Sequence, residues 1–142
     1  MKLFILFTYF LCAYCANINV QTLSQARQNL AGAGLTTKGI AMFAGGYYFG
    51  STSASRIASK AVDIYNVNTN AWSTDVLSQE RYDLSGVSVD SKNLIIFAGG
   101  MSSSTNYYTT VDVYDAGTNQ WLPGYALTVA RAGMMATTLP NQ

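Results

Sequence analysis

Few residue types in this chain of 142 residues are suited to catalysis. The sequence contains no histidine, which excludes serine–histidine and cysteine–histidine nucleophile pairs and the common zinc sites. Asp63 and Asp112 are the carboxylates that a glycosidase would require, but both occupy the same place in a repeated segment, which favours a structural role. We therefore predict that the chain is not an enzyme and that it carries no metal and no cofactor.

The two cysteines, Cys12 and Cys15, have the C-x-x-C spacing that in other settings indicates redox chemistry or metal binding. They lie in residues 1–16, where one positive charge, an apolar run and then small residues are typical of a secretory signal peptide. A membrane anchor is the alternative, although the apolar run of about 14 residues is shorter than the roughly 20 of a spanning helix. We predict cleavage after Cys15 or Ala16, no membrane attachment afterwards, and a secreted protein without a disulfide.

Charged residues make up only 11% of the chain, and eight basic side chains nearly balance seven acidic ones. They are scattered singly, without the basic stripe of a nucleic-acid-binding protein, so no nucleic-acid partner is expected. Ser, Thr, Asn and Gly are frequent, a composition that suits short β-strands joined by turns.

The residues that could do chemistry are positioned by a repeat. Residues 23–46 (LSQARQNLAGAGLTTKGIAMFAGG) align without a gap with residues 77–100 (LSQERYDLSGVSVDSKNLIIFAGG). Residues 62–72 (VDIYNVNTNAW) align with residues 111–121 (VDVYDAGTNQW), and a third copy begins at Leu127. Such self-similarity at a period of about 50 residues indicates a repeat architecture.

Within each copy the pattern favours four short strands. They are expected near residues 30–36 and 84–89, at 40–44 and 94–98, around 62–64 and 111–113, and around Trp72 and Trp121. Turns are expected at residues 68–70 and 116–119. The fold class that we predict is therefore all-β, built of four-stranded antiparallel sheets.

At this point the chain resembles the kelch repeat family. The resemblance rests on the motif starts at Arg27 and Arg81, the double glycines and the Tyr–Trp pairs, in this order and spacing. It implies a kelch-type β-propeller with a blade at about residues 24–76, a second at about 77–126 and the first strand of a third at about 127–139. It also implies that the first strand of each blade is innermost and that the Trp-bearing strand is outermost.

A propeller ring needs four to eight blades, and residues 17–142 supply about two and a half. We therefore expect a fragment, the N-terminal part of a larger secreted propeller, in which residues 17–23 could be a single outer strand. The alternative is a complete small protein. If the chain exists as such, self-association through its open blade face is expected, because one blade cannot bury both faces alone.

The repeated positions are candidates for binding or for structure. The double glycines could be a phosphate loop, but no helix follows them, which favours a sharp structural bend. The arginines could bind an acidic peptide, as the resemblance implies, or tie down loops by pairing with acids such as Glu80 or Asp83. The Tyr and Trp side chains could stack on a sugar or fill the space between blades. The residues concerned are Gly45, Gly46, Gly99 and Gly100; Arg27, Arg81 and Arg131; and Tyr65, Trp72, Tyr114 and Trp121.

The loops after the glycines, at residues 47–60 and 101–110, are the best binding candidates because they differ between copies and are rich in Tyr, Ser and Asn. The side chains that we expect to bind are Tyr47, Tyr48, Phe49, Arg56, Tyr107 and Tyr108. We thus predict a secreted, non-catalytic kelch-repeat binding or scaffold module for a protein or glycan. The alternative is the N-terminal fragment of a galactose-oxidase-like carbohydrate oxidase whose copper site lies in other sequence.

Overall fold

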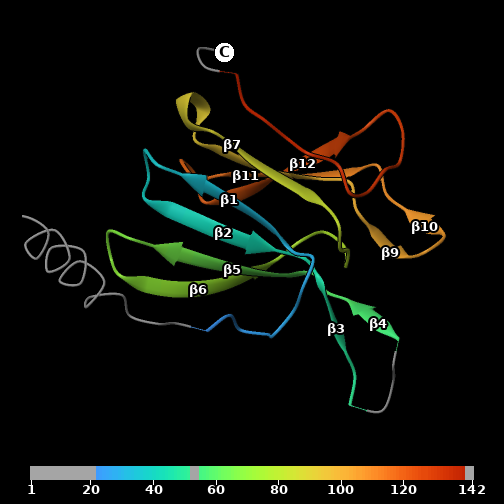
Figure 1. Ribbon diagram of the computed structural model, residues 1–142. Helices are drawn as coiled ribbons and strands as arrows, with labels where there is room; N and C mark the ends of the chain where they lie inside the picture. The colour runs from blue at the N-terminus through green and yellow to red at the C-terminus, as the bar shows by residue number, and fades with distance from the viewer. Residues whose placement is uncertain (1–21, 52–54, 140–142) are drawn as a thin grey trace, which may run out of the picture.

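The computed structural model describes residues 22–51 and 55–139 and contains two four-stranded antiparallel sheets (Figure 1). The first sheet has the order β1 (Ala31–Leu35), β2 (Ile40–Ala44), β5 (Ala61–Asn66), β6 (Ala71–Val76). The second has the order β7 (Ser85–Val89), β8 (Leu94–Ala98), β11 (Thr110–Asp115), β12 (Gln120–Ala126). Two hairpins complete the fold: β3 (Tyr47–Phe49) with β4 (Arg56–Ala58), and β9 (Met101–Ser103) with β10 (Asn106–Tyr107).

The described residues contain no α-helix, only one 3-10 turn at Asp90–Lys92, and so no helix among them is long and apolar enough to cross a membrane. The all-β prediction and the antiparallel four-stranded sheets are confirmed, and β2 and β8 have the predicted bounds. The predicted signal peptide lies outside the described residues.

Residues 127–139, expected to contain a third first strand, form no strand in the described structure. The physical reason is the pairing pattern of the sheets. Strands β1 and β7 are each held by the strand that follows them, β2 and β8, through a complete antiparallel ladder. No such following strand is described after residue 139.

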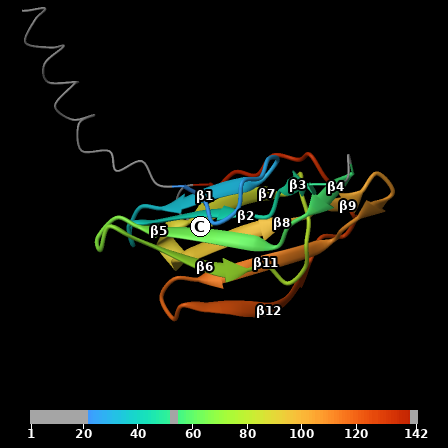
Figure 2. The same cartoon turned by 90° about the horizontal axis from the view of Figure 1, so that it is seen from below.

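Successive side chains of a strand point to opposite faces of its sheet. The two sheets pack face to face because each turns apolar side chains toward the other. The first sheet contributes Leu35, Met42 and Val62 to the core, and the second contributes Ile95 and Phe97; none is more than 1% exposed. Figure 2 shows the first strands β1 and β7 on one side of the molecule and the outer strands β6 and β12 on the other. The two Trp-bearing strands therefore lie at the outer edges.

The first strands of the two sheets approach each other closely. A Cβ atom built on Gly86 of β7 would lie 3.0 Å from the carbonyl oxygen of Gly32 in β1. At the ends of these strands, residues 54 apart in the sequence bind one another across the sheets. The Asn29 amide donates to Asp83 at 2.5 Å, and the Thr36 hydroxyl donates to Asp90 at 2.6 Å. Equivalent positions of consecutive repeats therefore contact one another directly.

The same backbone hydrogen bonds recur from one repeat to the next. The Gly46 N–H donates to the Arg81 carbonyl and the Gly100 N–H donates to the Arg131 carbonyl, both at 2.9 Å. The Asp83 N–H likewise donates to Asn29 at 3.1 Å, as the Gly133 N–H donates to Asp83 at 2.8 Å. Residues 127–133 therefore lie against the second repeat as residues 77–83 lie against the first.

Candidate binding surface

Arg27 is held inside the first repeat. Its side chain is fully buried, its Nη2 atom lies 2.6 Å from a carboxylate oxygen of Asp63, and its Nε–H donates to the Gly45 carbonyl at 2.6 Å. Burial alone would raise the pKa of Asp63, but hydrogen bonds from Ser24 and Arg27 outweigh it and hold that pKa below its usual value. The pair fastens the start of the repeat to β5.

Arg81 repeats this arrangement in the second repeat. Its side chain is fully buried, and its Nη2 atom lies 2.5 Å from Asp112, which is 8% exposed. Burial lowers the pKa of Arg81, and the neighbouring Asp112 opposes that effect. Among the described residues, Nε and Nη1 of Arg81 find no hydrogen-bond partner, so Arg81 is less well satisfied than Arg27.

These contacts bear on the two interpretations of the arginines. Arg27 and Arg81 each pair with an acid, as one interpretation expected, but the acids are Asp63 and Asp112 and not Glu80 or Asp83. Both guanidinium groups are buried, so their N–H groups, including the two unpaired ones of Arg81, are not exposed to an acidic ligand. The structural role expected for the two aspartates fits their position as the partners of these arginines.

Arg131 is the exposed member of the set. Its Nε–H donates to the carbonyl of Val129 at 3.2 Å, and no described acidic residue pairs with it. Its backbone is nevertheless fixed to the second repeat through Gly100 and Tyr108. Of the three arginines at the repeat starts, Arg27, Arg81 and Arg131, only Arg131 is exposed.

The double glycines are structural. A Cβ atom on Gly45 would lie 2.6 Å from the Arg81 carbonyl oxygen, and one on Gly99 would lie 2.5 Å from that of Arg131. Both glycines also have positive φ angles, 68° and 63°, that other residues rarely adopt. The bend brings each strand end against the next repeat, which leaves no room for a side chain there. Gly46 and Gly100 repeat the pattern, each with a Cβ position 2.8 Å from a carbonyl oxygen.

The Tyr–Trp pairs pack against each other within each sheet. The ring centroids are 5.1 Å apart for Tyr65 and Trp72 and 5.2 Å apart for Tyr114 and Trp121. Trp121 also reaches across to the first sheet, where its Nε1–H donates to Asp75 at 2.9 Å. The Nε1–H of Trp72 is buried and has no acceptor among the described residues.

The two candidate segments, which were expected to be loops, form hairpins. In the first hairpin, Tyr47 is buried, while Phe49 is 52% exposed and packs edge-on against it at 5.5 Å. The Arg56 guanidinium lies 4.9 Å above the Tyr47 ring and 5.9 Å from that of Tyr82. A hydrogen bond to Tyr82, followed by the Tyr47 hydroxyl, raises the pKa of Arg56.

The second hairpin carries a polar cluster. The Tyr108 hydroxyl donates to Ser102 at 2.8 Å, and the Asn106 amide donates to both of these oxygens at 2.9 Å. Tyr107 is 46% exposed and makes the main apolar contribution of this hairpin to the surface. The remaining candidate, Tyr48, is half-buried and pairs with Ile57 across the first hairpin.

The hairpins lie at the same end of the two sheets, and β4 is next to β9 (Figure 1). Tyr82 joins them, since its ring packs on Tyr47 at 5.1 Å and its backbone pairs with Met101. Sequence reasoning missed Tyr82. Comparison of the repeats could have found it, because an aromatic residue stands there where the first repeat has Gln28.

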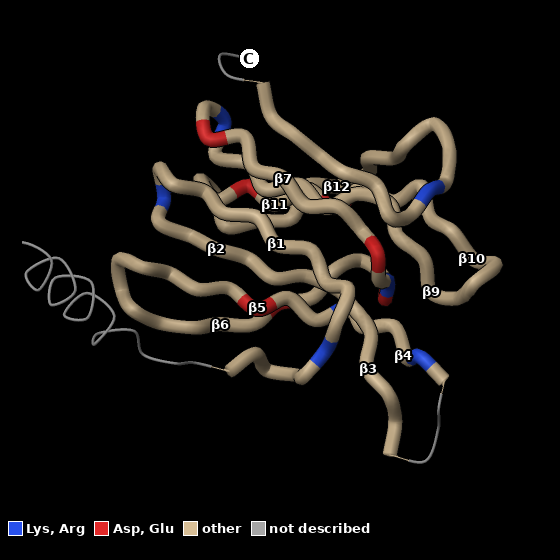
Figure 3. Tube along the Cα trace, viewed as in Figure 1, with Lys and Arg blue, Asp and Glu red and all other residues tan. Residues whose placement is uncertain are grey.

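Charge is sparse around this surface. Figure 3 shows the Lys and Arg residues scattered along the described trace. In the described part of the chain, no group of three or more His, Cys, Asp or Glu side chains is placed to hold a metal ion. Neither a comparison with protein-family models nor a search of curated proteins finds a match to this chain.

Proposed function

We propose that the chain is a secreted, non-catalytic binding module of the kelch type, in which each four-stranded sheet is one blade of a β-propeller. Three observations support the proposal. The two sheets share one strand order, their first strands lie side by side, and equivalent backbone hydrogen bonds link each repeat to the next. A β-propeller is built by repeating this arrangement of one sheet against the next.

The paired hairpins are the observation that carries the binding role. They project from one end of two rigid sheets and present Phe49, Arg56 and Tyr107 to solvent. Exposed aromatic side chains provide contact area at a low cost in conformational entropy, and the hydroxyl and amide groups of the second hairpin provide hydrogen bonds. The ligand class that we propose is a protein or a glycan.

The test compares the secreted full chain with a double variant, Phe49→Ser with Tyr107→Ser, on arrays of extracellular proteins and of glycans. Val67→Ser is the matched control, because Val67 is 58% exposed but lies in the turn between β5 and β6. We expect at least one ligand whose signal falls in the double variant and not in the control. The proposal fails if every bound ligand is indifferent to the hairpin substitutions.

The extracellular location has its own test. We expect the chain expressed from its own start codon in eukaryotic cells to appear in the medium with an N-terminus at Ala16 or Asn17. Mass spectrometry of the secreted product measures this directly. Retention of the unprocessed chain in the cells would contradict the proposal.

We also propose self-association through the open face of the second sheet. Ile96 and Val111 are half-buried there, whereas Met42 and Val62, their equivalents in the first sheet, are fully buried. Sedimentation velocity at rising concentration should show an assembly that Ile96→Asn weakens and that Val67→Asn, on an exposed turn, leaves unchanged. A monomer at all concentrations would overturn the proposal.

A further inference from the structure

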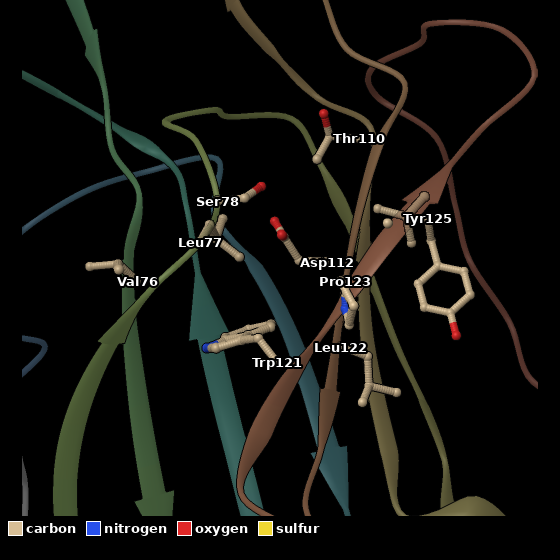
Figure 4. A pocket seen from close by; sticks show the side chains of 11 residues that line it. Val76, Leu77, Ser78, Thr110, Asp112, Trp121, Leu122, Pro123 and Tyr125 are labelled. Carbon is tan, nitrogen blue, oxygen red and sulfur yellow. The ribbon is translucent and has the colours of Figure 1, made fainter.

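A groove separates the outer strands of the two sheets (Figure 4). It has a volume of about 450 Å³, within the range of small-molecule sites. One wall is the end of β6 and the residues after it, Val76 to Ser78, and the other is β12 from Trp121 to Tyr125. It contains none of the hairpin residues and is therefore a separate surface.

A bulge in β12 opens this groove. Leu77 follows Trp72 by five residues, whereas Leu127 follows Trp121 by six. The extra residue shifts the pairing of β11 with β12 between Val111 and Val113. The bulged segment contains Pro123, which cannot donate a backbone hydrogen bond, and Gly124, whose φ angle is 83°.

The polar end of the groove presents oxygen atoms. Figure 4 shows the side-chain oxygens of Ser78, Thr110 and Asp112 near one end and the indole of Trp121 toward the other. One carboxylate oxygen of Asp112 pairs with Arg81, while the other accepts no hydrogen bond within the described chain. In the first repeat, Oδ1 of Asp63 accepts the backbone N–H of Ser24 at 2.9 Å, so the second repeat leaves an acceptor unused.

The charge of the groove decides between ligand classes. The carboxyl group of Asp112 forms an ion pair with the buried Arg81, which offsets its charge, so the groove does not favour a cation. A neutral ligand with hydroxyl donors can use the free carboxylate oxygen without bringing in a charge. Its apolar C–H face can lie on the indole of Trp121.

We propose that this groove binds a neutral pyranose unit of a glycan. The hydroxyls of the sugar donate to Asp112 and exchange hydrogen bonds with Ser78, and its C–H face stacks on Trp121. In the first sheet the equivalent Trp72 has Phe43 stacked on its ring at 6.0 Å. This site lies beyond the hairpin surface and does not depend on it.

The test is titration of the full chain with methyl-β-D-glucopyranoside and with methyl-α-D-galactopyranoside. Tryptophan fluorescence and saturation-transfer NMR monitor binding. Butylammonium chloride is the cationic comparison. We expect saturable, millimolar binding of at least one glycoside and none of butylammonium. Ser78→Ala should weaken glycoside binding, because it removes one hydrogen-bond partner of the sugar. Ser78 is exposed, and the variant is expected to fold.

The hairpin variant Phe49→Ser with Tyr107→Ser is the matched control and should bind the glycoside as the unaltered chain does. Failure of both glycosides to bind overturns the proposal, as does binding of butylammonium alone. Glycoside binding that falls only in the hairpin variant also overturns it and supports the hairpin surface instead. The outcomes for the two surfaces are thereby distinguishable.

Discussion

The two repeats use the same motif in different surroundings, and the motif arginine makes the contrast plain. Arg81 lies between the two sheets and is fully buried with Asp112, whereas Arg131, at the same place in the next copy, is exposed. Both are anchored by the same backbone bond from a glycine of the preceding repeat. The preceding repeat therefore supplies the backbone hydrogen bond that anchors each motif arginine, whereas burial of the arginine side chain requires the sheet that follows it.

The outer strands differ as well. Trp121 donates to Asp75 of the neighbouring sheet, and a bulge beside it opens a groove. Trp72 has Phe43 and Tyr65 against its ring and a buried N–H without an acceptor in the described chain. The interface between the repeats is therefore where equivalent residues acquire different roles.

The largest expected effect is at the buried arginine. Arg81→Met should destabilise the chain by about 3–5 kcal/mol, because it leaves the carboxylate of Asp112 buried without its cation. Arg131→Met is the control and should change stability by less than about 0.5 kcal/mol, since that side chain is exposed. Urea denaturation of the two variants measures both values. Equal effects would contradict the difference in burial.

A glycine pair gives the second test. Gly45→Ala forces a positive φ angle of 68° on alanine and places a Cβ atom 2.6 Å from the Arg81 carbonyl. We expect a loss of about 2–4 kcal/mol from strain and overpacking together. Gly124→Ala also has a positive φ, 83°, but its Cβ atom meets nothing within 4 Å, so only about 1 kcal/mol should be lost. Thermal unfolding of the two variants, monitored by circular dichroism, separates the cost of the steric contact from the cost of the backbone strain.

The strands were predictable because two weak signals coincided. Unbroken apolar runs, IAMFA and LIIFA, mark β2 and β8, and the gap-free repeat places them at the same point of each copy. The turns followed from Asn and Gly at equivalent positions, of which Asn70 and Asn119 have positive φ angles of 51° and 56°. Such local signals require no knowledge of how the sheets pack.

The candidate site was harder to predict because it depends on contacts between repeats. Arg27 and Arg81 pair with aspartates more than 30 residues away, and acids close in sequence were the only partners that local reasoning offered. Tyr82 joins the first hairpin although it belongs to the second repeat. The groove depends on one extra residue in β12, whose effect on the width between strands is not visible in a linear pattern.

The tryptophans give a smaller test of the same comparison. Trp→Phe removes similar apolar volume at either site, but at Trp121 it also removes the hydrogen bond to Asp75. We expect Trp121→Phe to cost about 1 kcal/mol more than Trp72→Phe, because the bond goes to a charged acceptor at a partly exposed position. At Trp72 the substitution removes a buried N–H that has no described acceptor. Denaturant midpoints of the two variants measure the difference, and the reverse order would count against the assignment.

The smallest expected effect concerns the turn after the third strand of each sheet. Asp115 accepts the backbone N–H of Gly117 at 2.7 Å, and Asn66, its equivalent, accepts that of Asn68 at 2.9 Å. The hydrogen bond from Gly117 is the main cause that lowers the pKa of Asp115, and hydrogen bonds from Thr118 and the charge of Lys38 add to it, against an opposing effect of burial. The turn of the second repeat therefore titrates, whereas that of the first does not.

The sign of this effect follows from the lowered pKa of Asp115. The stabilisation is present above the unfolded value of about 3.9 and is lost as the pH falls through the lower folded value. The amide nitrogen shifts of Gly117 and Thr118, followed by NMR from neutral pH downward, should move with a midpoint below about 3.9. Those of Asn68 should stay constant, and Asp115→Asn should abolish the movement while leaving the fold unchanged at neutral pH. A midpoint at or above the usual aspartate value would show that the turn does not hold the charged carboxylate in the way its hydrogen bonds require.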